Sequence, residues 1–112
     1  MSTARLPTHV WVTGLMRRVE AAGGFATILH KGEPSQGAVL LVAREKDGSE
    51  QVFSRVLGPD GARHWAVMAR TEDAALDKVT QYIASQRRYD PDLWVIELDI
   101  AQAQQLIADT DL

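Results

Sequence analysis

The chain has 112 residues, of which 46% are hydrophobic and 24% charged, and it contains no cysteine. This length and composition predict a single globular domain over residues 1–112. The missing cysteine excludes disulfides, thiolate zinc sites, iron–sulfur clusters and a cysteine nucleophile. The longest apolar run, residues 38–43, is much shorter than the roughly 20 residues of a membrane span, so we expect a cytoplasmic protein without a membrane segment.

The net charge of −3 is unevenly distributed along the chain. Residues 1–31 contain four basic and one acidic side chain, whereas residues 72–112 contain nine acidic and three basic ones. The acidic C-terminal segment argues against nucleic-acid binding, because phosphate contacts need clustered Lys and Arg. The asymmetry is compatible with head-to-tail pairing or a basic partner, but a solvated acidic surface at the C-terminal end is the simpler explanation.

The N-terminal segment predicts a helix from Thr8 to Ala22. Thr8 is a candidate N-cap, and the pair Gly23-Gly24 supplies a helix stop. One helical face is apolar, with hydrophobic residues at helical spacing: Val12, Leu15, Met16, Val19 and Ala22.

Four strand-like runs follow, at residues 25–30, 38–43, 51–57 and 64–69. The connections between them are short, and Asp47-Gly48 is a tight-turn pair, so the pattern predicts an antiparallel meander. The run 38–43 is apolar without alternation, which is typical of a central strand that is covered on both faces or that faces a partner.

A second helix is expected to begin at Thr71-Glu72-Asp73, with Thr71 as its cap, and to end at Asp90-Pro91. A fifth strand follows over residues 93–98, and the tail 101–112 is either a short helix or mobile. We therefore predict an α+β fold of order α-β-β-β-β-α-β: an antiparallel sheet, with a four-strand meander and a fifth strand, and two helices packed on one face.

No motif predicts catalysis, a metal site or a cofactor. Gly32 and Gly37 lack the Lys-Ser/Thr and the helix of a phosphate loop, and His9, His30 and His64 lack metal-ligand spacing. Ser35 lies near His30 and Glu33, which invites a triad interpretation, but a polar hairpin turn is the simpler one.

The remaining candidates are aromatic and basic side chains. Trp11, Trp65 and Trp94 are either core residues or anchors for a partner. The arginine pairs are most simply solvated cations on helix surfaces. If the chain binds a ligand, the site is predicted where the loop 31–36 meets the arginine pairs and the segment 89–94. Its candidate residues are Arg17, Arg18, Lys31, Glu33, Arg87, Arg88 and Trp94.

Three stretches, VWVTGLMRRVEAAGG (10–24), KGEPSQGAVLL (31–41) and YDPDLWVIELD (89–99), resemble an uncharacterised family from Alphaproteobacteria, a domain of unknown function of about this length. The resemblance covers nearly all of the chain before residue 100. It implies a cytosolic bacterial protein and carries no activity, cofactor or catalytic residue.

Taken together, these features predict a non-enzymatic domain that acts by protein–protein contact, as a homodimer through a sheet edge or an apolar sheet face. One alternative is a binder of small anionic ligands, or a minor enzyme, with its site at the loop 31–36. The other is an RNA-binding module built on the basic N-terminal helix.

Overall fold

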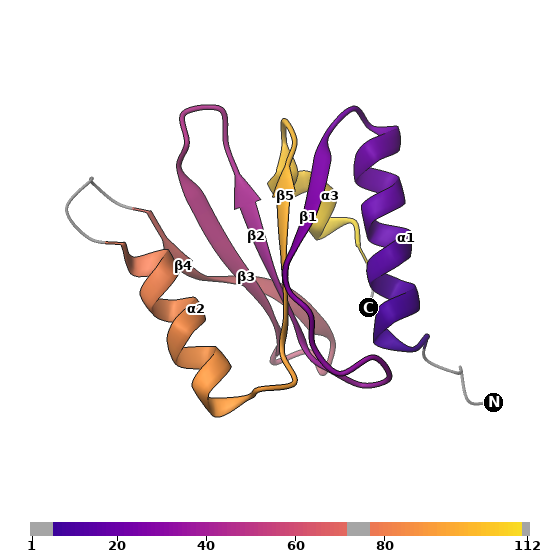
Figure 1. Ribbon diagram of the computed structural model, residues 1–112, viewed down its shortest axis with the longest axis vertical. Coiled ribbons are helices and arrows are strands. Elements are labelled where there is room, and N and C mark those ends of the chain that lie inside the picture. Colours follow the sequence, from indigo (N-terminus) through magenta and orange to yellow (C-terminus); the bar gives the residue numbers. More distant parts are fainter. Residues whose placement is uncertain (1–5, 72–76, 111–112) are drawn as a thin grey trace.

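The computed structural model describes residues 6–71 and 77–110. These residues form helices, strands and connecting turns that follow the predicted order, with one further helix at the end (Figure 1). The elements are α1 (Thr8–Ala21), β1 (Phe25–His30), β2 (Val39–Arg44), β3 (Glu50–Leu57), β4 (Arg63–Arg70), α2 (Lys78–Tyr89), β5 (Trp94–Asp99) and α3 (Ala103–Ala108).

The α+β class is confirmed, but the sheet is mixed rather than antiparallel. Its strand order is β1-β5-β2-β3-β4. Strands β2, β3 and β4 form the predicted antiparallel hairpins, whereas β5 enters between β1 and β2 and runs parallel to β2. The prediction of a four-strand meander is therefore wrong, because the loop 31–38 is long enough to leave room for a strand between β1 and β2.

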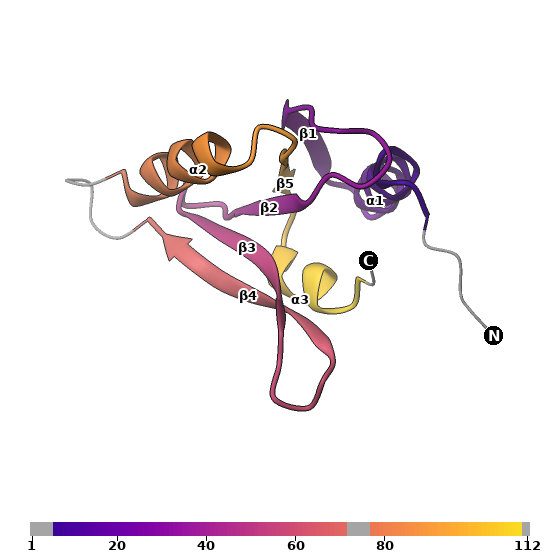
Figure 2. The ribbon, with the colours of Figure 1, turned by 90° about the horizontal axis from the view of Figure 1, so that it is seen from below.

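The helices cover both faces of the sheet, so the prediction that they share one face is also wrong (Figure 2). Alternate residues of a strand point to opposite faces. Leu41 and Ile96 pack in one core with α1 and α3, and Val42 and Val95 pack in a second core with Val79 of α2. The unbroken apolar run of β2 follows from this burial on both faces, which was one of the two explanations that the sequence predicted for it; the other was a partner.

The helix termini differ from the predictions in detail. Thr8 does not cap α1; it is the first helical residue, and its hydroxyl donates to the backbone oxygen of Gly37 at 2.9 Å. Thr71 does not cap α2 either, because its backbone N–H donates to Glu50 in continuation of β4. The cap of α2 is Asp77, whose carboxylate accepts from the Thr80 N–H. The predicted helix start at Glu72-Asp73 lies outside the described residues.

The tail forms the short helix α3, one of the two predicted outcomes, and α2 ends at Tyr89 before Asp90-Pro91 as predicted. Within residues 6–71 and 77–110, no helix has the length and apolar character needed to cross a membrane.

Candidate functional site

The loop 31–38 is held by backbone contacts on two sides. The start of α1 donates to it from Thr8 N to the oxygen of Ser35 at 3.1 Å and from His9 N to the oxygen of Pro34 at 2.8 Å. On the other side, Glu33 N donates to the oxygen of Asp92 at 3.0 Å. The loop is therefore fixed between α1 and the segment that leads into β5, as the sequence predicted for the segment 89–94.

Two glycines allow this close approach. A Cβ atom at Gly32 would lie 2.1 Å from the oxygen of Asp92, and one at Gly37 would lie 2.6 Å from the same atom. Both positions also face the indole ring of Trp94. The two glycines thus serve packing of the loop on β5 rather than a phosphate.

The carboxylate of Glu33 shapes the turn itself. It accepts hydrogen bonds from Ser35 N at 3.0 Å and from Gln36 N at 2.6 Å, and these bonds lower the pKa of Glu33. Because the carboxylate holds the backbone of Ser35 and Gln36, the loop has the geometry of a polar turn. This agrees with the hairpin-turn interpretation of Ser35 rather than with the triad interpretation.

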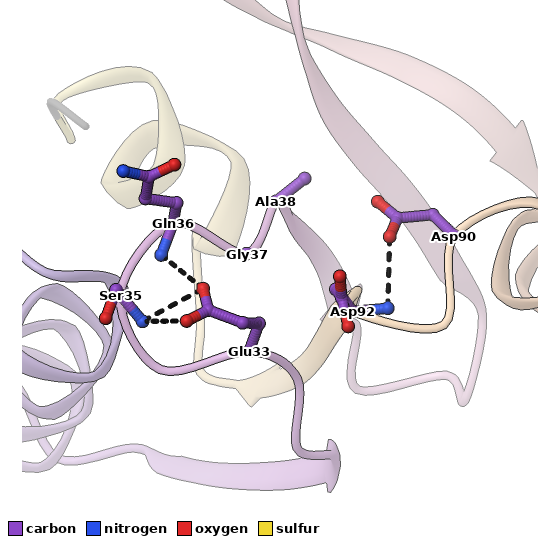
Figure 3. A pocket seen from close by; sticks show the side chains of 7 residues that line it. All are labelled: Glu33, Ser35, Gln36, Gly37, Ala38, Asp90 and Asp92. Carbon is purple, nitrogen blue, oxygen red and sulfur yellow. Dashed lines mark hydrogen bonds between the residues drawn. The ribbon is translucent and has the colours of Figure 1, made fainter.

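An open pocket of about 550 Å³ lies between this loop and the turn after α2 (Figure 3). Three acidic side chains line it, Glu33, Asp90 and Asp92, together with Ser35 and residues 36–38. An Asp90 carboxylate oxygen accepts from Asp92 N at 3.0 Å, so this carboxylate also stabilises a turn. A small anion entering this pocket would meet carboxylates, so its charge does not suit the predicted anionic ligand.

The predicted cationic residues do not gather at this pocket. Arg17 and Arg18 are exposed on the last turns of α1, and the guanidinium of Arg18 donates to the Thr110 hydroxyl at 3.4 Å. Lys31 is exposed at the start of the loop, and Arg88 is exposed at the end of α2.

Arg87 approaches the end of β1. Partial burial lowers the pKa of His30, and the positive charge of Arg87 lowers it further. The ends of β1 and α2 therefore lie near each other.

The tryptophans are part of the core. Trp94 is 2% exposed, and its indole faces the loop glycines rather than solvent. Trp11 and Trp65 stack with their ring centroids 6.0 Å apart, and the Arg55 guanidinium lies 5.4 Å from the centre of the Trp65 ring. The core interpretation of the three tryptophans therefore fits the structure better than that of partner anchors.

The histidines are separated. His64 contacts the Asp60 carboxylate at 3.1 Å in the turn between β3 and β4, while a ring nitrogen of His9 lies 3.1 Å from the oxygen of Pro34. Among the residues that the structure describes, no three histidine or carboxylate side chains are placed to hold a metal ion.

A feature that sequence reasoning missed is the exposure of β1. This strand ends the sheet, and its apolar side chains are open to solvent: Phe25 is 73% exposed, Leu29 40% and Ile28 38%. The run FATILH looks like a buried strand, and only the strand order reveals it as an edge. The absence of alternation and of charged residues in this run favours a buried strand, so nothing in the sequence indicated its exposure.

A model of a family described as a protein of unknown function (DUF1491) matches residues 6–108. A crystal structure of a DUF1491 family protein from Caulobacter crescentus CB15 superposes with a TM-score of 0.79 at 34% identity, covering 91% of this chain and 94% of that chain. An NMR structure from the same organism and family gives 0.77 at 33% identity, with 94% of each chain covered. A solution structure of a protein from A. tumefaciens gives 0.76 at 29% identity, covering 97% and 98%. A comparison with curated proteins finds no match.

Proposed function

The chain belongs to the DUF1491 family, which has no assigned function. We propose that it is a protein-interaction domain that pairs with a second copy of itself through the outer edge of β1, the last strand of the described sheet. The observation that carries this proposal is the exposure of apolar side chains along an edge strand. Native proteins usually protect such an edge, because its backbone N–H and C=O groups are a template for another strand.

The two edges of the sheet differ in how they are protected. Strand β4 has arginine at both ends, Arg63 and Arg70, and a register shift against β3. Strand β1 has no lysine, arginine or carboxylate, and its irregularity is confined to Leu29, near its end. Charges and bulges discourage strand addition, so β1 is the more receptive edge.

The sequence of β1 suits antiparallel pairing with itself. A two-fold axis at Thr27 sets Thr27 against Thr27 of the partner subunit and Ala26 against Ile28 of the partner subunit. Residues that oppose each other in antiparallel strands share a face, so a small side chain meets a large one. In the same register Phe25, the most exposed apolar side chain of the strand, comes next to the irregular position at Leu29 of the partner subunit.

An edge of six residues gives a small interface, below the roughly 1,200 Å² of most stable complexes. We therefore expect a weak dimer that forms with rising concentration. Sedimentation equilibrium over a wide concentration range measures this directly: the average mass should rise from one 12.4 kDa chain toward two.

Charge substitutions at Thr27 test the register. Thr27→Lys places two lysines opposite each other and should abolish association, whereas mixing Thr27→Lys with Thr27→Glu should restore it. Thr80→Lys, at an exposed position of α2, is the matched control and should associate like the unmodified chain. A mass that stays at one chain at millimolar concentration, or a Thr27→Lys variant that still pairs, overturns the proposal.

A further inference from the structure

A second open pocket, of about 500 Å³, lies where two turns converge at the end of α1. The turn from α1 to β1 contributes Ala22 and Gly23, and the segment from β5 to α3 contributes Ile100 and Gln102. A Cβ at Gly24 would lie 2.5 Å from Ile100 Cβ, so the two turns are in direct contact.

One wall of the pocket carries a positive charge. Arg18 reaches it from α1, and within residues 6–71 and 77–110 its guanidinium makes one hydrogen bond, the 3.4 Å contact with the Thr110 hydroxyl. That hydroxyl also donates to the oxygen of Leu106 at 2.7 Å. A guanidinium has five N–H donors in a planar fork, so it retains donors for a carboxylate.

The part of the pocket formed by α3 and the residues that flank it carries a negative charge and an apolar strip. Asp109 lines the pocket and accepts from the Gln105 amide at 3.2 Å. Leu106 and Ile100, both half-buried, supply the apolar surface. The pocket therefore combines a cation, an anion and an apolar side, which distinguishes it from the acidic pocket beside Glu33.

The backbone is strained at the mouth of this pocket. Gln102 has a φ of +60°, the one positive value found for a non-glycine residue in the described part of the chain. Glycine adopts this region without steric cost, and a glutamine does not. Strained positions of this kind gather at binding sites, where the surrounding contacts hold them in place.

We propose that this pocket binds a zwitterionic α-amino acid with an apolar side chain. Arg18 binds the carboxylate, Asp109 binds the ammonium group, and the ligand side chain packs on Leu106 and Ile100. In this arrangement each charged side chain of the pocket meets a ligand group of opposite charge. The proposal is independent of pairing through β1, since no residue of β1 lines the pocket.

Three probes that share the branched apolar chain of leucine separate the contributions of its two charged groups. L-Leucine carries both charges, 4-methylpentanoate lacks the ammonium group, and 3-methylbutylamine lacks the carboxylate. In NMR titrations of the full chain, leucine should shift the amide signals of residues 100–109 and of the end of α1. Each of the other probes should bind about tenfold more weakly or worse, because a charged hydrogen bond is lost.

Neighbouring arginines provide a matched control. Arg18→Gln should weaken leucine binding at least tenfold, whereas Arg17→Gln, at an exposed position outside the pocket, should not change it. Asp109→Asn should weaken leucine binding but leave 4-methylpentanoate unaffected or tighter. Equal binding of the three probes, or equal effects of the two arginine variants, overturns the proposal. So do amide shifts confined to other parts of the chain, or no shifts at about 10 mM leucine, a concentration at which even a weak site would be partly occupied.

Discussion

The indole N–H of Trp94 donates a hydrogen bond of 2.7 Å to the backbone oxygen of Glu33, which lies 61 residues earlier in the chain. This bond joins the loop 31–38 to the first residue of β5. The carboxylate of the same glutamate holds the turn at Ser35 and Gln36. Glu33 is therefore bound through its backbone to the sheet and through its side chain to the loop, and this explains how a polar loop keeps one geometry.

We predict that Trp94→Phe lowers the free energy of unfolding by about 1–3 kcal/mol, because the Glu33 oxygen loses its partner and the smaller ring leaves a cavity. Urea unfolding followed by circular dichroism measures the loss. Trp65→Phe is the control, since the Trp65 indole donates to the Thr110 oxygen at 3.1 Å in a less buried place. A loss for Trp94→Phe no greater than that for Trp65→Phe would contradict the anchoring role.

Two glycine-to-alanine substitutions should have opposite effects. Gly32→Ala places a methyl group against the Asp92 oxygen and the Trp94 ring, so it should destabilise the fold by ~1–3 kcal/mol. Gly14 lies inside α1 with no atom within 4 Å of an added Cβ, so Gly14→Ala should stabilise it by about 1 kcal/mol. Thermal unfolding of both variants measures the two changes in stability. If both variants were stabilised, or both destabilised, the room available to the added methyl group would not explain the effects.

The positions of the elements could be predicted because they depend on local patterns. The apolar spacing of α1 and the turn at Asp47-Gly48 act over a few residues. The strand order depends on a contact between segments far apart in the chain, and nothing local in residues 93–98 distinguishes a strand that enters the sheet interior from one added at an edge. The exposure of β1 follows from that order, so it was also out of reach.

The residues of the predicted ligand site do not all lie together, for a geometric reason. The loop contacts α1 at Thr8 and His9, whereas Arg18 lies ten residues further along the helix. At 1.5 Å per residue, this separation is about 15 Å, so Arg18 lies far along the helix from the loop. Glu33 lines the pocket beside the loop, whereas Arg18 reaches the residues that follow α3, a contact that no local sequence pattern shows.

A carboxyl pair lies on the α2 face of the sheet, beyond either pocket. Glu50 stands opposite Arg44 on β2, while Glu97 on β5 stands opposite Val42, and Val42 belongs to the core beneath α2. Burial raises the pKa of Glu50, and a hydrogen bond with Glu97 and the negative charge of that residue raise it further. Asp77 adds to this rise in pKa, and Arg44 opposes it.

A raised pKa means that the folded chain keeps the Glu50 proton to a higher pH than the unfolded chain does. The stability contributed by this proton is complete below the ordinary glutamate pKa of 4.5 and is lost as the pH rises through the folded pKa. Glu50→Gln removes this loss, so we expect the variant to gain stability over the unmodified chain from pH 4 toward pH 7, with little difference near pH 3.

Urea unfolding at each pH measures the difference in free energy of unfolding between the two chains. Carboxyls such as Asp77, whose pKa is lowered, contribute equally to both chains and therefore cancel in this difference. Glu20→Gln, at an exposed position of α1, is the control and should show no such trend. A difference between Glu50→Gln and the unmodified chain that is constant with pH, or that shrinks toward neutrality, would show that the two carboxyls do not share a proton in the fold.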